Sequence, residues 1–123
     1  ASYNAVFTKL ADESEALYAQ LGVLSTEIDT LKAAYQTDAT TLSNDIANFN
    51  QKANGGGFTS DSEFNKQRAV LLNRSKLLEA QRTLINAKVK LYNEDNIKYQ
   101  ALVVQSEALN KSIDSTVAPA PSL

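Results

Sequence analysis

Side chains that commonly do chemistry are few in this sequence of 123 residues. It contains no histidine and no cysteine, so the commonest general base, the commonest metal ligand and the thiol nucleophile are missing. The remaining candidates are adjacent acids, Asp12 with Glu13 and Glu94 with Asp95. Adjacent side chains diverge on a helix, whereas residues three or four apart share a face. We therefore predict no catalytic, cofactor-binding or metal site, and a protein that is not an enzyme and takes no small-molecule substrate.

Basic residues concentrate between residues 60 and 92, where seven lysines and arginines stand against three acids. Residues 1–52 have the opposite balance, seven acids and three bases, and the formal net charge of the chain is −2. Binding to nucleic acid depends on positive charge that the protein itself does not neutralise, so we predict no nucleic-acid partner. No apolar run approaches the roughly 18 residues of a membrane-spanning helix, so we also predict no membrane insertion.

One break divides the chain, the run Asn54-Gly55-Gly56-Gly57. Gly22 is the only other glycine, and the first proline is Pro119. Because glycine and proline are the residues that disfavour helix most strongly, their positions predict two long helices around one turn. The predicted segments are a helix over about 2–53, a turn at 54–59, a helix over about 60–117 and a Pro/Ala tail at 118–123.

Apolar residues in the first predicted helix recur from Leu17 onward at steps of three and four, and Leu10 lies one heptad earlier; this spacing is typical of helices that pack at a shallow angle. They are Leu10, Leu17, Leu21, Leu24, Ile28, Leu31, Tyr35, Ala39, Leu42, Ile46, Phe49 and Ala53. Two consecutive steps of four join Leu31, Tyr35 and Ala39. Such a stutter locally unwinds a left-handed supercoil, so we expect a straighter stretch near Tyr35.

The second predicted helix opens with Ser60-Asp61-Ser62-Glu63, the pattern of a capping box. In that arrangement the Ser60 hydroxyl accepts from the backbone N–H of Glu63, and the Glu63 carboxylate reaches back to the backbone N–H of Ser60. Acids here also suit the positive end of the helix dipole. The pattern predicts that the helix begins at about residue 60.

This second helix carries two adjacent apolar seams. The first seam contains Phe64, Leu71, Leu78, Ile85, Val89, Tyr92, Tyr99, Val103 and Ile113. The second seam contains Val70, Leu77, Ala80, Leu84, Ala87 and Leu91. One seam suffices for one neighbouring helix. The second seam therefore predicts either a further neighbour, through self-association or a protein partner, or one wide stripe wrapped around the first helix.

A register test favours an antiparallel hairpin with the glycines at its tip. In that arrangement, facing residues have numbers that sum to about 112 or 113, and this register matches apolar with apolar residues. It pairs Phe49 with Phe64, Leu42 with Leu71 and Ile28 with Ile85, and sets Asp45 level with Arg68, Asp38 with Arg74 and Asp29 with Arg82. The predicted fold class is all-α, a long antiparallel two-helix coiled-coil hairpin with a Gly-rich tip, which dimerises into a bundle if the second seam is used.

Two residues near this register leave alternatives open. Phe58 lies outside both seams, so it either folds back onto the hairpin or is presented to a partner at the tip. Gly22 is either a site of close helix packing or a tolerated defect that costs about 1 kcal/mol.

Residues 43–104 carry aromatic-Asn and Leu-Asn pairs around a Gly-Gly turn. The pattern contains Ile46-x-x-Phe49-Asn50, Asn54-Gly55-Gly56, Phe64-Asn65-x-x-Arg68, Leu84-Ile85-Asn86, Tyr92-Asn93 and Tyr99. It resembles the helical-hairpin segments of many uncharacterised bacterial exported proteins, some of which lie upstream of a matrixin-like zinc metalloprotease domain. The resemblance implies a bacterial, exported coiled-coil hairpin. It does not imply protease activity, because the metalloprotease signature His-Glu-x-x-His needs histidine, and Tyr99 departs from the pattern because Gln100 follows it.

The predicted function is a non-enzymatic, exported hairpin that acts as a structural spacer, stalk or assembly module through helix–helix packing. The alternative is a binding module, such as an adhesin or secreted effector, that presents the tip with Phe58 to a partner. A third possibility is an accessory region that regulates an enzyme in a longer chain. The start Ala1-Ser2 fits either signal-peptidase cleavage or a shortened chain, and the expected location is the periplasm, the cell surface or the medium.

Overall fold

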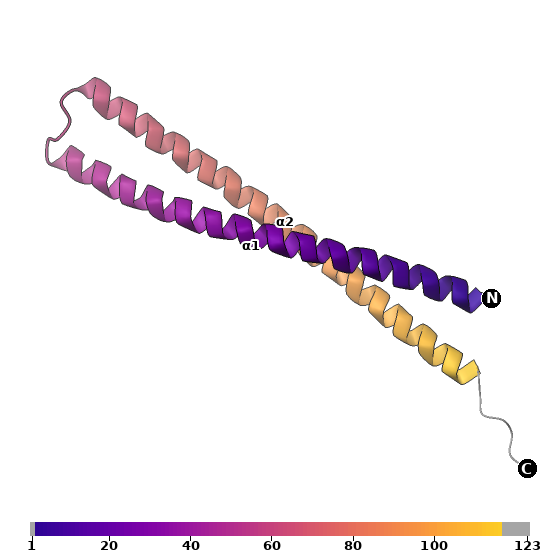
Figure 1. Cartoon of the computed structure of the whole chain (residues 1–123). Helices are drawn as coiled ribbons and strands as arrows, with labels where there is room; N and C mark the ends of the chain where they lie inside the picture. Colours follow the sequence, from indigo (N-terminus) through magenta and orange to yellow (C-terminus); the bar gives the residue numbers. More distant parts are fainter. Residues whose placement is uncertain (1, 117–123) are drawn as a thin grey trace, which may run out of the picture. The chain divides into compact units, whose positions relative to one another are not determined.

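The computed structural model describes residues 2–116, which form two long helices that pack against each other (Figure 1). Helix α1 runs over Ser2–Asn54 and helix α2 over Asp61–Thr116, and no strand occurs within the described residues. The predicted tail at 118–123 lies outside them. Neither helix, over the described residues, contains a stretch long and apolar enough to span a membrane.

The end of α1 is a Schellman motif made by the glycine run. The N–H of Gly57 donates to the carbonyl of Lys52 at 2.8 Å and the N–H of Gly56 donates to that of Ala53 at 3.4 Å, the paired bonds that define the motif. Gly56 has a φ of 69°, which lies in the left-handed region. Helix α1 therefore ends at Asn54 because Gly56 turns the chain, and Gly56 is the glycine of the run that the backbone geometry requires.

Alanine substitutions at two glycines should change stability in opposite directions. We expect Gly56→Ala to destabilise the protein by about 1–2 kcal/mol, because an L residue with a Cβ is strained at positive φ. Gly22 is exposed inside α1, and a Cβ added there would meet no atom within 4 Å, so it is a tolerated defect and Gly22→Ala should stabilise by about 0.5–1 kcal/mol. Urea unfolding followed by circular dichroism measures both. A shift of the same sign for the two variants would contradict the assignment.

The chain divides into two compact units, Ala1–Thr26 with Lys90–Leu123 and Glu27–Val89. We refer to them as the first and second units. The apolar residues that are buried are Leu21 and Leu24 in the first unit, and Ile28, Leu42 and Ile85 in the second. All of them belong to the seams predicted for the two helices to share.

The predicted α1 seam faces inward along its whole length. Each of its twelve members is buried or half-buried, and this includes Leu31, Tyr35 and Ala39 at the stutter. The first seam of α2 behaves in the same way over its described side chains, from Phe64 to Val103. However, no side chain in the described part of the chain is completely buried. Each helix of a two-helix contact covers one side of its neighbour, so the core stays thin.

Candidate functional site

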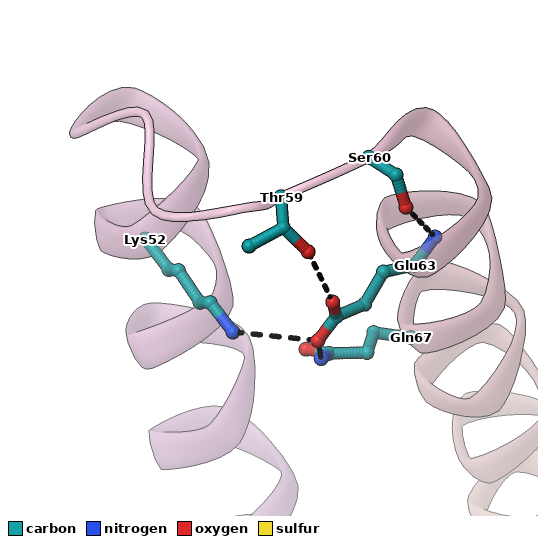
Figure 2. A network of polar contacts seen from close by, with 5 residues as sticks. All are labelled: Lys52, Thr59, Ser60, Glu63 and Gln67. Carbon is teal, nitrogen blue, oxygen red and sulfur yellow. Dashed lines mark hydrogen bonds and ion pairs between the residues drawn. The ribbon is translucent and has the colours of Figure 1, made fainter.

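A polar network surrounds the start of α2 (Figure 2). The Ser60 Oγ accepts from the backbone N–H of Glu63 at 3.2 Å, as predicted. The Glu63 carboxylate instead accepts from Thr59 Oγ1 at 2.9 Å and from Gln67 Nε2 at 3.1 Å, and Lys52 Nζ lies 3.9 Å from it. The prediction that Glu63 reaches back to the Ser60 N–H is therefore wrong, because two side-chain donors and a lysine hold the carboxylate elsewhere.

Three phenylalanines form a cluster beside this network. The ring centroids of Phe49 and Phe64 lie 5.1 Å apart, and the Phe58 ring lies 5.2 Å from each of them. Lys52 Nζ lies 4.6 Å from the centroid of Phe58, within cation–π range. Phe58 is half-buried. In the structure the Phe58 ring folds back onto the helices and is not presented at the tip. It joins the connecting segment to both helices.

Polar residues occupy a second inward-facing row of α2, next to its first seam. The members recur at every seventh position and are half-buried or buried: Gln67, Arg74, Gln81, Lys88 and Asp95. This row was not predicted from the sequence, where the inward-facing positions were identified by the spacing of apolar residues. The heptad spacing was the signal that could have revealed it, since these residues lie three positions after first-seam residues and so share their side of the helix. Those first-seam residues are Phe64, Leu71, Leu78, Ile85 and Tyr92.

Members of this row make polar contacts with α1 inside each unit. In the second unit, Arg74 Nη1 lies 2.6 Å from Asp45 Oδ2, and Lys88 Nζ lies 2.7 Å from Glu27 Oε2. Both pairs are half-buried, so they are less screened than fully exposed pairs. They join α1 to α2 on one side of the apolar seam.

The first unit contains a buried carboxylate. Asp95 is 4% exposed and is the buried charged residue of the described chain. Its Oδ2 accepts from Gln20 Nε2 at 2.9 Å. A polar residue inside a helix–helix seam selects register at a cost in stability, and this is the structural role that the Gln20–Asp95 contact supports.

Two predicted ion pairs have different partners in the structure. Asp45 was expected opposite Arg68 and Arg74 opposite Asp38, but Asp45 pairs with Arg74, and Arg68 is exposed. Side chains of an α-helix lean toward its N-terminus. Arg74 therefore leans toward the start of α2, where Phe64 contacts Phe49, and it reaches Asp45 rather than the residue level with its own backbone.

The third predicted ion pair, Asp29 with Arg82, is also wrong. Arg82 Nη1 lies 2.8 Å from Glu79 Oε1 on its own helix, and the Arg82 side chain is 56% exposed. A residue three positions away on the same helix is always within reach of a long side chain. An exposed arginine takes that partner without having to reach across to α1.

The second seam of α2 faces solvent. Val70 is 55% exposed, Leu77 56%, Leu84 47% and Leu91 40%, and Ala80 and Ala87 are exposed as well. These residues are therefore not a wide stripe wrapped around α1, which was one of the two alternatives for the seam. They form a regularly spaced apolar surface that the rest of the described chain leaves about half exposed.

Two grooves of the second unit border the seam. The larger has a volume of about 600 Å³ and is lined by both helices, with Phe49, Val70 and Leu71 as its apolar members. The smaller, of about 170 Å³, is lined by residues that include Leu42, Leu77 and Leu78. Arg74 lines both. Grooves that are open to solvent and expose apolar side chains among charged ones suit the side chains of another helix.

No family model, curated protein or solved structure matches this chain. The resemblance of residues 43–104 to exported hairpins therefore stays a prediction. Within residues 2–116, no group of three or more acidic, histidine or cysteine side chains is placed to hold a metal ion. The candidate site is the surface of the second unit built from Val70, Leu77 and Leu84 of the second seam and the two grooves.

Proposed function

We propose that this chain is a non-enzymatic helical hairpin that acts as a structural spacer or assembly module through helix–helix packing. The observation that carries the proposal is the row of Val70, Leu77 and Leu84, about half exposed at heptad spacing on α2. Solvated apolar rows of this regularity favour docking of a further helix. Export to the periplasm, cell surface or medium is part of the proposal and rests on the resemblance of residues 43–104.

The antiparallel form of the hairpin is supported by contacts of the second unit. Lys52 lies near Glu63, Asp45 pairs with Arg74, and Glu27 pairs with Lys88. As the residue number falls along α1, the number of its partner rises along α2. We propose that the chain reverses direction at the connecting segment, with Gly56 at the tip.

The register of this hairpin is supported by the same contacts. The Phe49–Phe64 ring contact has residue numbers that sum to 113, which matches the expected backbone level. The ion pairs have larger sums, 115 or 119. In an antiparallel pair the two side chains lean toward each other along the axis, because each leans toward its own N-terminus. Long side chains should therefore meet at sums above the backbone value, as they do.

Replacing Leu77 and Leu84 together by glutamate should dissociate the assembly and keep the hairpin helical. Burying a leucine contributes about 1.5–3 kcal/mol, and every 1.4 kcal/mol is about tenfold in affinity. The double variant should therefore raise the dissociation constant about 100-fold or more. Sedimentation equilibrium measures the association, and circular dichroism measures the helix content.

Leu72→Glu is the matched control for this test. Leu72 is 46% exposed and lies on α2 outside the second seam, so its replacement adds a negative charge to the same helix without touching the row. We expect this variant to associate as the unaltered protein does. A protein that is a strict monomer at high concentration would refute the assembly role.

A further inference from the structure

We infer that the second seam of one copy packs on α1 of a second copy, over the grooves of the second unit, so that two hairpins form a four-helix bundle. The inference rests on the proposed assembly role and adds the identity of the partner surface. The simpler alternative is α2 against α2 of the second copy. The geometry of the grooves and the charges of their walls favour the contact with α1.

The grooves place apolar recesses between the two helices. The larger groove lies between Asn48 and Phe49 of α1 and Val70 and Leu71 of α2. Its volume of about 600 Å³ is several times that of one side chain of leucine. A helix that packs only against α2 would leave this space empty, and unfilled space at an interface forfeits dispersion contacts. A helix laid across toward α1 fills it.

The charges of the groove walls are segregated by helix. Helix α1 contributes three acids and one base. Asp38, Asp45 and Lys52 line the grooves, and Glu27 forms an ion pair with α2. On α2 the corresponding residues are three bases and one acid: Glu63, Lys66, Arg74 and Lys88. The α1 wall is therefore acidic and the α2 wall is basic.

These signs decide between the two arrangements. Contact of α2 with α2 of a second copy brings two basic walls together, and like charges across an interface suppress association. Contact of α2 with α1 of the second copy brings a basic wall onto an acidic one. A two-fold axis then produces two equivalent contacts of this kind, because each α2 covers the other copy's α1.

The thin core of a single copy supports a bundle of four helices. In the second unit, Ile28, Leu42 and Ile85 are the buried apolar residues, and no described side chain is completely buried. Four-helix bundles bury each helix against two neighbours. Docking on a second copy would cover Val70 and Leu77 and would deepen the burial of Phe49 and Leu71 at the groove.

A charge-reversal experiment tests the arrangement in the full chain. Lys66 on α2 and Asp38 on α1 are exposed, and neither makes an ion pair in the described structure, so the variants Lys66→Glu and Asp38→Lys leave the contacts within one copy in place. Each variant alone meets like charge at both symmetric contacts of its dimer. We expect each to weaken self-association about tenfold, measured by sedimentation equilibrium at low salt.

Mixing the two variants should restore association. In the mixed dimer, Glu at position 66 faces Lys at position 38, and the native Lys66 and Asp38 face each other at the second contact. Sedimentation equilibrium of the mixture should therefore show a complex about as tight as the unaltered protein. Ser75→Glu, an exposed position of α2 outside the grooves, serves as the control and should change neither self-association nor mixing.

Three other outcomes would each contradict a different part of the inference. An Asp38→Lys protein that associates like the unaltered one excludes α1 from the interface and leaves the assembly role standing, with α2 against α2 or a different face as the contact. A mixture that is no tighter than the separate variants excludes the pairing of the two walls. An unaltered protein that stays monomeric overturns the assembly role and this inference together.

Discussion

Replacing Leu42 by alanine should lower the free energy of unfolding by about 2–5 kcal/mol, the usual cost of removing a buried leucine side chain. Leu42 is 5% exposed and lines the smaller groove beside Leu78. The core is one side chain thick here, so few neighbours can move in to fill the space. Because small proteins are stable by only about 5–15 kcal/mol, the loss should be visible as a large fall in the urea midpoint.

Leu72→Ala is the control for the Leu42 prediction. The same atoms are removed from a side chain that is 46% exposed, and a surface substitution of this kind should change stability by less than about 0.5 kcal/mol. Both unfolding curves should be recorded at one protein concentration, because association stabilises the folded state by mass action. Equal losses for the two variants would show that Leu42 does not belong to the core.

Replacing Gln20 and Asp95 together by leucine should stabilise the protein by about 1–4 kcal/mol, as found when buried charged groups are exchanged for apolar side chains. Asp95 is 4% exposed, and its carboxylate has given up water for a hydrogen bond to a neutral amide. Desolvation of a carboxylate costs more than one such bond returns. Leucine at position 95 continues the packing next to Tyr92 and Tyr99. Urea unfolding gives the change in free energy.

The same double variant should lose some specificity of register. A buried polar residue in a seam, such as Asp95, penalises slipped arrangements, so its removal should broaden or multiply the amide peaks of the first unit in an NMR spectrum. Asp29→Leu is the matched control, because Asp29 is exposed on α1 and its replacement buries nothing. A double variant that is less stable than the unaltered protein would show that the Gln20–Asp95 contact is a net stabilising interaction.

The sequence predicted which residues form the candidate surface, but it did not predict whether that surface is exposed. Sequence spacing identified Val70, Leu77 and Leu84 as a second seam, because heptad periodicity is a property of the chain alone. Whether α1 covers that seam depends on how far α1 reaches around α2. That is a matter of helix orientation about the axis, which periodicity does not specify, and the structure leaves the seam exposed.

Local properties of the chain were sufficient to predict the two helices and many of the side chains that face inward. Two nearly uninterrupted runs predict two helices, since helix formation depends on residues within a turn of each other. The Ser60 cap and the glycine stop act over similarly short distances. Steps of three and four place the α1 seam inside for the same reason, and each of its members is buried or half-buried.

Only the tertiary structure decided which polar residues meet. The row from Gln67 to Asp95 faces inward because α1 supplies partners such as Asp45 and Gln20. The type of a polar residue and its place in the sequence do not indicate whether the other helix offers it a partner. The pairing of Asp45 with Arg74 depends on the lean of two side chains toward each other. The place of Phe58 likewise depends on two rings from different helices. Local sequence thus determined the elements and their apolar faces, and packing between helices decided the contacts.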